Sequence, residues 1–538
     1  MKYFLKVFFF LFSIFFCFAQ EDESLNNPSQ NTQKNQPKFS LNDAINIALE
    51  NNYEIKKQRY ALASARAQYR QIKGTLDIEA GAQAQYSQKQ NPVDENDPNY
   101  ALGYNWLSPA FNYGVFSDNT LSEQTGGSVF LKKLFSFGLE TKLSYTVQRQ
   151  KNKPQFTYDK TFDAATFKKY EQEDGRNTGE IALELSLPLF KSFKNSLASL
   201  QLESAKDLIE QMEYKLQDTI SQSMIAVSQS YWNYFLTCKN VEQLEILQRK
   251  IEERNGNMEN LIKAGVRSRN DLLAMQVNVN ENRRQLQEAR VQQNKAKIDL
   301  MTSLGVQDFS FINEVENPFN DIDLKSVQIP RAEELNEEFF NSVEESRTDL
   351  LALKKNMEMA AIKVRYSKAD RLPDATLNFS VGSTGATYSD EPGKIVGAGF
   401  WNQRGVNLSG MLGASIKLGN NTKGGSLEQA EAEYNTSLNE YTKARNTVVL
   451  QIHNAQNKLE IYKNLVSDAD EVLTLDKKLY ENEQKRFNAG LITVDNLLQQ
   501  DQKYLSAENS YCQVLINYMQ AILEYKYYTA NLVAIDMP

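Results

Sequence analysis

One segment of this chain occurs twice, and the second copy follows the first at a constant offset of 225 residues. The first copy reads Ala264-Gly265-Val266 and the second reads Ala489-Gly490-Leu491. The same offset places Ala205 on Ala430 far upstream, and no gap is needed between these points. A register kept over such a length predicts an internal duplication, and therefore two similar halves around a pseudo-symmetric assembly.

Residues 1–19 have the features of a secretory signal peptide. Lys2 and Lys6 precede a short apolar run, and small residues end it at Cys17-Phe18-Ala19. We therefore expect cleavage after Ala19. Lipid attachment at Cys17 is the less favoured alternative, because the residues before that cysteine are bulky. Residues 20–37 are polar and are predicted to form a flexible segment.

Charge and composition exclude several functions. The formal net charge is −8, and loss of the two leader lysines makes it −10, which argues against nucleic acid as a partner. After the leader no apolar run is long enough for a membrane-spanning helix. The lone His453 cannot build a multi-histidine metal site. Cys238 and Cys512 are either small buried residues or a disulfide between helices. No catalytic motif stands out, so an enzyme is a weak interpretation.

Four segments alternate between apolar and polar residues and predict strands. They cover residues 76–86, 181–189, 375–381 and 406–418. A strand with one apolar and one polar face suits a transmembrane β-barrel with a wet lumen, although a soluble antiparallel sheet shows the same pattern. A long insert at 88–178 contains a further hairpin at 129–147, and the pattern leaves open whether this hairpin joins the barrel.

Very long helices follow the strands in each half. An apolar stripe with steps of three and four runs from Leu202 to beyond Val241, which is typical of a coiled coil. A helix over 202–262 would span roughly 90 Å, so it must pack beside other helices along its length. Gly265 and Gly490 suit the left-handed residue that ends a helix, and Asn270-Asp271 and Asp495-Asn496 can cap the returning helices. Shorter helices are expected at 40–73 and 331–367.

Each half thus reads helix, strand, loop, strand, long helix, sharp turn and returning helix. This order resembles the TolC-like family of outer-membrane efflux proteins (outer membrane factors) over about residues 38–535. The most specific matches are the segment from Phe487 to Leu497 and its partner from Ala264 to Leu272. The junction Leu187-Pro188-Leu189-Phe190 also resembles that of the family. The domains are a first repeat at 38–306, a linker at 307–331 and a second repeat at 332–538.

The resemblance implies a mainly α fold with a transmembrane β-barrel. Three protomers would each give four strands to a twelve-stranded barrel in the outer membrane, and their coiled-coil helices would form an α-barrel in the periplasm. The implied function is the exit duct of a tripartite efflux or type I secretion system. Its partners would be a periplasmic adaptor, an inner-membrane pump and outer-membrane lipid, with no cofactor. The alternative is a secreted coiled-coil structural or adhesin-like protein, and the transported substrate stays open.

The resemblance also assigns site residues. The adaptor-facing tips would be Ala264, Gly265, Val266, Ala489, Gly490 and Leu491. The family often narrows the tunnel with carboxylate rings, so the channel constriction would hold Asp271, Asp495, Asn496 and Gln499. Because Asn496 and Gln499 are neutral, we expect a soft polar constriction in place of a strongly acidic gate.

Overall fold

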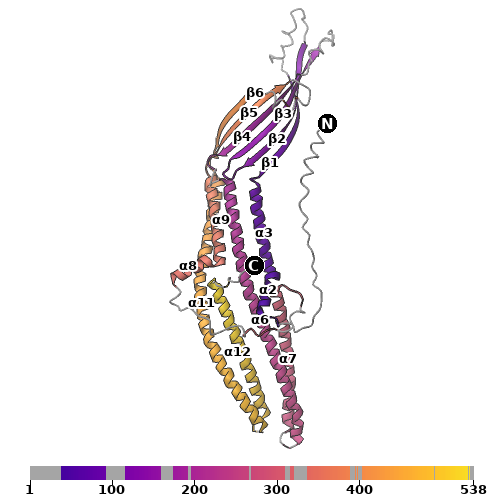
Figure 1. The fold of residues 1–538 in the computed structure, drawn as a ribbon, viewed down its shortest axis with the longest axis vertical. Helices are drawn as coiled ribbons and strands as arrows, with labels where there is room; N and C mark the ends of the chain where they lie inside the picture. Colours follow the sequence, from indigo (N-terminus) through magenta and orange to yellow (C-terminus); the bar gives the residue numbers. More distant parts are fainter. Residues whose placement is uncertain are drawn as a thin grey trace, which may run out of the picture.

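The computed structural model describes most of the chain. The described residues are 38–92, 115–158, 174–191, 196–263, 265, 268–308, 315–319, 336–387, 394, 397, 403–489, 491–530 and 532. The predicted signal peptide and the polar segment at 20–37 lie outside them. The molecule is elongated, with a sheet at one end and long helices running to the other (Figure 1).

The elements follow the same order in both halves, except that the first half has four strands and the second half has two. The first half contains α2 (Leu41–Asn51), α3 (Tyr53–Gly74), β1 (Ile78–Pro92), β2 (Val115–Leu134), β3 (Glu140–Tyr158), β4 (Asp174–Pro188), α6 (Leu197–Lys263) and α7 (Arg269–Leu304). The second half contains α8 (Glu337–Ser346), α9 (Thr348–Asp370), β5 (Asp374–Thr387), β6 (Gln403–Ser415), α11 (Asn421–Asn488) and α12 (Val494–Tyr528). The predicted combination of one long helix and one returning helix is therefore present twice, as α6 with α7 and as α11 with α12.

Helices α6 and α11 have 67 and 68 residues, so each spans about 100 Å. A helix of this length has no single globular core to pack against, and its stripe is buried by other helices along its length. The duplication is visible in that stripe, since Ala205 of α6 is 4% exposed and its counterpart Ala430 of α11 is fully buried.

The helices form two rows, one towards the sheet and one towards the opposite end of the molecule. We call the level between the two rows the equator. Towards the sheet, contacts run α3 to α6, α6 to α9 and α9 to α11. Towards the tips, they run α7 to α6, α6 to α12 and α12 to α11 (Figure 1). Helices α6 and α11 belong to both rows and make them one continuous wall. A large core cluster around Tyr231, Trp232 and Leu300 fills the equator.

The two short helical regions are each broken in two, which the sequence did not predict. The expected helix at 40–73 ends at Asn51, and Asn52 caps α3 by accepting from the backbone N–H of Glu54 and Ile55. The Asn52 amide also donates to the carbonyl of Ser303 at 2.7 Å, at the end of α7. There Gly305, with φ +74°, ends the returning helix so close to Asn51 that a Cβ would lie 2.4 Å from its carbonyl oxygen.

The second break, at Arg347, packs against the end of the other returning helix. The guanidinium forms two hydrogen bonds to the Asp349 carboxylate, at 2.8 and 3.0 Å, and one to Gln451 at 3.2 Å. It also lies 5.4 Å from the ring centres of Tyr527 and Tyr528 in α12. The two breaks therefore perform the same task, which is to fasten a short helix pair to the end of a returning helix.

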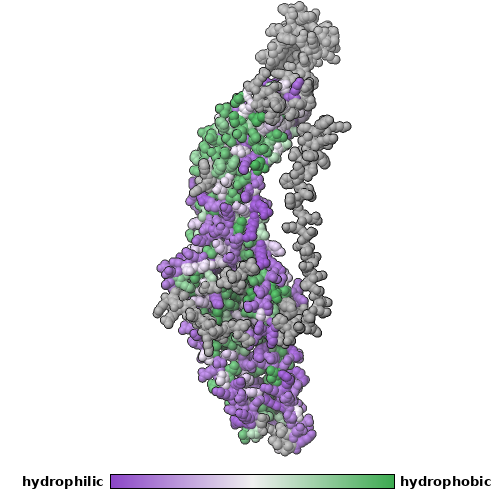
Figure 2. All heavy atoms as spheres, in the orientation of Figure 1, coloured by the Kyte–Doolittle hydropathy of each residue, from purple (hydrophilic) through white to green (hydrophobic). Residues whose placement is uncertain are grey.

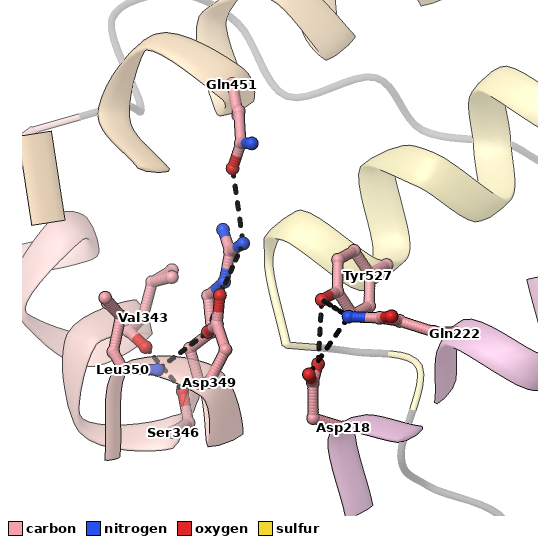
Figure 3. A network of polar contacts seen from close by, with 9 residues as sticks. Asp218, Gln222, Val343, Ser346, Asp349, Leu350, Gln451 and Tyr527 are labelled. Atoms are coloured by element: carbon pink, nitrogen blue, oxygen red, sulfur yellow. Dashed lines mark hydrogen bonds and ion pairs between the residues drawn. The ribbon is translucent and has the colours of Figure 1, made fainter. Parts of the chain in front are cut away.

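Figure 3 shows Tyr527 of α12 beside Asp218 and Gln222 of α6. The Tyr527 hydroxyl donates to Asp218 at 2.7 Å, and Gln222 donates to the same carboxylate at 3.0 Å. Burial raises the pKa of Asp218, although the hydrogen bond from Tyr527 acts in the opposite direction. Helices α6, α9, α11 and α12 thus meet in one polar network at the equator.

The sheet has six strands in the order β1-β2-β3-β4-β5-β6, and all neighbours are antiparallel. The described sheet therefore has six strands, two more than the four expected per chain. The hairpin at 129–147 is part of two long strands, β2 and β3, which lie between β1 and β4. The predicted fourth strand also ends earlier, at Ser415, so Ile416 and Leu418 follow it.

The register places apolar residues on one face of the whole sheet. One cross-strand row consists of Ala80, Leu131, Leu143, Leu183, Val381 and Leu408. The neighbouring row on the opposite face includes Glu79, Lys132, Lys142 and Glu184, and there Lys142 pairs with Glu184 at 3.2 Å. Figure 2 shows hydrophobic residues gathered over the sheet and hydrophilic residues over much of the helical part. One face is thus suited to lipid and the other to water.

Candidate functional site: helical tips, outer faces and sheet

The first tip joins α6 to α7 at the end of the molecule far from the sheet. Gly265 there has φ +73°, and its N–H donates to the Ile262 carbonyl at 3.0 Å. The prediction that Gly265 ends the helix in the left-handed region is confirmed. A Cβ at this position would meet no atom within 4 Å, so the tip is open around it. Ala264 and Val266 lie outside the described residues.

The second tip joins α11 to α12. The N–H of Ala489 donates to the Lys485 carbonyl, and the N–H of Leu491 donates to that of Arg486. The side chain of Leu491 is 69% exposed. Gly490 lies outside the described residues. Each tip therefore presents small or exposed apolar residues away from the sheet.

The two tips share one core. Met258 of α6 and Met275 of α7 pack with Val494 and Leu498 of α12, and all four are buried. The α6–α7 and α11–α12 hairpins of one chain therefore lie side by side at their ends.

The helices after the tips begin at different caps from those predicted. Ser268 caps α7, and Thr493 caps α12 by accepting from the Asn496 N–H at 3.3 Å. Asp271 is the third helical residue, and its carboxylate accepts from the Ser268 N–H at 2.9 Å and from its hydroxyl at 3.0 Å. This is a capping box, in which two side chains satisfy the first backbone donors.

The mismatch between Asp271 and Asn496 has a structural meaning. Both are the third residue of their helix, at the same offset from Ser268 and Thr493. Only the first tip has the reciprocal carboxylate of a capping box. The side chains of Asn496 and Gln499 are exposed, that of Asp271 is half-buried, and that of Asp495 lies outside what the structure describes. Whether these four line a constriction stays a prediction.

A buried ion pair connects the two hairpins above the tips. Arg254 of α6 donates to Asp501 of α12 at 2.5 Å, and the Asp501 side chain is only 2% exposed. Burial raises the pKa of Asp501, while the Arg254 guanidinium acts to lower it. Beside it Lys250 donates to the Tyr480 hydroxyl at 3.0 Å, and the Tyr480 ring stacks on Tyr504 at 5.0 Å.

The two outer faces of the lower helical row carry exposed apolar stripes. On α7 the stripe consists of Leu273, Val277, Val291 and Ile298, which are 55–68% exposed. On α11 it consists of Ile461, Leu465, Val472, Leu475 and Leu479, which are 41–58% exposed. The α11 steps of four, seven, three and four are those of a coiled-coil seam. Because α7 and α11 are the two ends of the row, each chain presents one seam on either side.

The remaining candidates behave as ordinary helix residues. His453 is exposed, and its ring lies 5.7 Å from that of Phe340. Cys238 and Cys512 are both free thiols, so the alternative of a disulfide between them is not what the structure shows. Among the described residues no group of three His, Cys, Asp or Glu side chains could hold a metal ion. Within the same residues no helix is long and apolar enough to cross a membrane.

Comparison with known families gives one match. The sequence model of the family described as "Outer membrane efflux protein" matches residues 340–524. Residues 340–524 belong to the outer membrane efflux protein family. The match runs from within α8 to within α12, including the second tip, and confirms the resemblance predicted from the sequence. It also confirms the predicted location, the outer membrane with an extension into the periplasm. No curated protein matches the chain.

Solved structures extend the likeness to the whole fold. The CmeC outer membrane channel of Campylobacter jejuni has a TM-score of 0.61 at 14% identity, and the match covers 95% of this chain and 94% of that one. The outer membrane protein VceC of Vibrio cholerae has 0.59 at 13%, covering 91% and 96%. The MtrE outer membrane channel of Neisseria gonorrhoeae, in its open state, has 0.60 at 14%, covering 91% and 89%. The fold of an outer-membrane channel with long helices is thus confirmed.

Two features near the tips were not predicted from the sequence. The Arg254–Asp501 pair joins residues far apart in the chain, and no local pattern marks it. The capping box did have a signal, because Ser268 and Asp271 stand at the spacing that defines this motif.

Proposed function

We propose that this chain is the exit duct of a tripartite efflux or type I secretion system. Three copies would close a ring, a periplasmic adaptor would bind the tips, and an inner-membrane pump would supply the energy. The chain itself acts as a passive conduit and catalyses no reaction. The family match and the channel fold support this proposal at the level of an efflux channel.

The observation that carries the proposal is the pair of exposed seams at the two ends of the helical row. Such a row buries its seams only by packing α11 of one copy against α7 of the next. This contact is heterologous, and it gives a closed ring when the rotation between copies closes. The edge strands β1 and β6 follow α3 and precede α11, so the same copies can pair their sheets. A monomeric secreted protein would leave both seams in water.

Membrane partition tests the proposal against the alternative of a secreted structural or adhesin-like protein. We expect trimers in the outer-membrane fraction that detergent extracts and that dissociate only on heating. Placing Glu at both Val472 and Leu475 should weaken these trimers, whereas Glu at the exposed helical residue Gly256 should leave them intact. A soluble monomer released from cells would contradict the duct.

The tips are the proposed docking site for the adaptor. Gly265 of the first tip is exposed with open space around its Cα, and Leu491 of the second tip exposes an apolar side chain. A small residue lets a second helical hairpin approach closely. Gly265→Arg and Leu491→Glu should therefore abolish co-purification with a periplasmic adaptor while trimers persist. Gly424→Arg, near the sheet, is the matched control. Undiminished adaptor binding by both tip variants would remove the tips from the proposal.

A further inference from the structure

The two inserted strands are the longest of the sheet and lie inside it. β2 has 20 residues and β3 has 19, against 13 to 15 for the other four strands. Both pair along most of their length, β2 with β1 and β3 with β4. The insert is thus part of the wall, and β1 and β6 remain the two edges of the described sheet.

The inserted strands also continue both faces of the wall. Leu131 and Leu143 extend the apolar row between Ala80 and Leu183. Their side chains are 49% and 46% exposed, so within one chain this row is uncovered. On the other face Lys132 and Lys142 continue the charged row. The alternation therefore runs in register through the insert, as a continuous membrane wall requires.

The turn of the insert is fixed to the helical part. Gly138 has φ +94°, and a Cβ there would lie 3.3 Å from both the Lys191 carbonyl oxygen and the Ser196 Cβ. The Ser196 hydroxyl donates to the carbonyl of Ser136. The turn therefore sits at the start of α6, where the sheet meets the helices.

The widths of the two layers agree only if all six strands belong to the wall. The upper row has four helices, which at a spacing of about 9 Å occupy roughly 36 Å of circumference. Six strands spaced about 4.8 Å apart and tilted by about 40° occupy roughly 38 Å, whereas four would occupy roughly 25 Å. The sheet is thus as wide as the helical row that carries it.

We propose that three copies close an eighteen-stranded barrel, in which β6 of each copy pairs with β1 of the next. This inference rests on the proposed trimeric duct. Lipid forbids open strand edges, so both edges need a partner, and a second copy offers the complementary edge. The barrel would be about 36 Å across at the backbone, against about 24 Å for twelve strands. Cargo that traverses the helical tunnel would then meet no narrowing of the wall at the membrane.

Cysteine labelling of the full-length protein in outer-membrane vesicles tests the wall directly. In a Cys238→Ser, Cys512→Ala background, a membrane-impermeant maleimide should label Ser128→Cys and Lys132→Cys from the lumen. It should label Val129→Cys and Leu131→Cys at least tenfold less. The matched control is β4, where Glu184→Cys should be labelled and Leu183→Cys should not. Alternation in both β2 and β4 supports the proposal.

The other outcomes separate this proposal from the proposed function. Alternation in β4 without alternation in β2 would place the insert outside the wall and overturn the eighteen-stranded barrel while the duct stands. Loss of alternation in both strands would contradict the membrane duct itself. Electron microscopy of the detergent-extracted trimer gives a second readout, since a cross-section with twelve strands overturns the inference. Deleting residues 115–158 should convert eighteen strands to twelve, because β1 and β4 are antiparallel and can then pair.

Discussion

The guanidinium of Arg254 lies 2.5 Å from the carboxylate of Asp501, and these two residues join the α6–α7 hairpin to the α11–α12 hairpin above the tips. Asp501 is among the most buried charged residues of the described chain. Removing one partner of a buried pair leaves an uncompensated charge, which is more costly than the pair itself. Any movement that separates the two hairpins therefore has to break this contact.

Arg254→Ala should lower the free energy of unfolding by about 3 kcal/mol, because it leaves the Asp501 carboxylate buried without its partner. Thermal unfolding of the trimer in detergent measures the change. Arg290→Ala is the control, since Arg290 pairs with Glu245 at the surface and should cost less than about 1 kcal/mol. Equal losses in the two variants would show that burial does not set the strength of the Arg254 contact.

The pH dependence of stability should carry a signature of Asp501. Burial raises the pKa of this carboxyl above the ordinary value of 3.8, so the folded protein binds more protons there than the unfolded chain does. Stability then falls as the pH rises from the unfolded pKa through the raised folded one. Asp501→Asn should remove this component, and Arg254→Ala should enlarge it. Identical pH profiles for wild type and Asp501→Asn would contradict the raised pKa.

Asp271 can be tested for a role beyond capping. Asp271→Asn removes the negative charge that a polar constriction would offer to cations. Multivalent cations should then block the channel current in lipid bilayers several-fold less strongly. Ser268→Ala is the control, because it disrupts the same capping box and keeps the carboxylate. If both variants change the currents alike, the effect comes from the cap and Asp271 is no gate.

Gly305 should not tolerate a side chain. Gly305→Ala forces an L-residue to φ +74° and drives its Cβ to 2.4 Å from the Asn51 carbonyl oxygen, so we expect a loss of more than about 2 kcal/mol. Gly256→Ala, in the interior of α6 with open space around it, should instead stabilise by about 1 kcal/mol. Chemical denaturation of the two variants measures both changes in the free energy of unfolding, the loss for Gly305→Ala and the gain for Gly256→Ala.

Arg347 should not be replaceable by lysine. Its planar fork binds Asp349 with two hydrogen bonds and lies over two tyrosine rings, which an ammonium group cannot do at once. We expect Arg347→Lys to destabilise the trimer by about 2 kcal/mol. Lys363→Arg, at an exposed pair with Glu433, should leave stability nearly unchanged. A neutral Arg347→Lys would mean that the equatorial network does not depend on this geometry.

The long helices were predictable because their packing repeats every few residues. The stripe on α6 is buried or half-buried along the helix, and such a pattern has few alternative interpretations. Ser40 and Asp43 likewise form the expected start of a helix, now as a capping box. The position of Gly265 followed from the need for a left-handed residue at a sharp turn.

The remaining features depend on contacts that no local pattern records. Neither a proline nor a glycine marks the helix breaks at Asn52 and Arg347. Each break is fixed by a contact with the end of a returning helix, about 250 and 180 residues further along the chain. The sequence left open whether the hairpin at 129–147 joins the wall, because the outer halves of its strands are polar. Only the register with β1 and β4 places these strands in the sheet.

Because of where the hairpin is inserted, the diameter of the barrel can change without a change in the contacts between subunits. Because β2 and β3 enter between β1 and β4, the edge strands and the helices next to them are left as they were. An ancestor could therefore gain or lose such a hairpin without having to evolve a new subunit seam at the same time. Outlet diameter would then be a trait that selection can adjust in steps of two strands per chain.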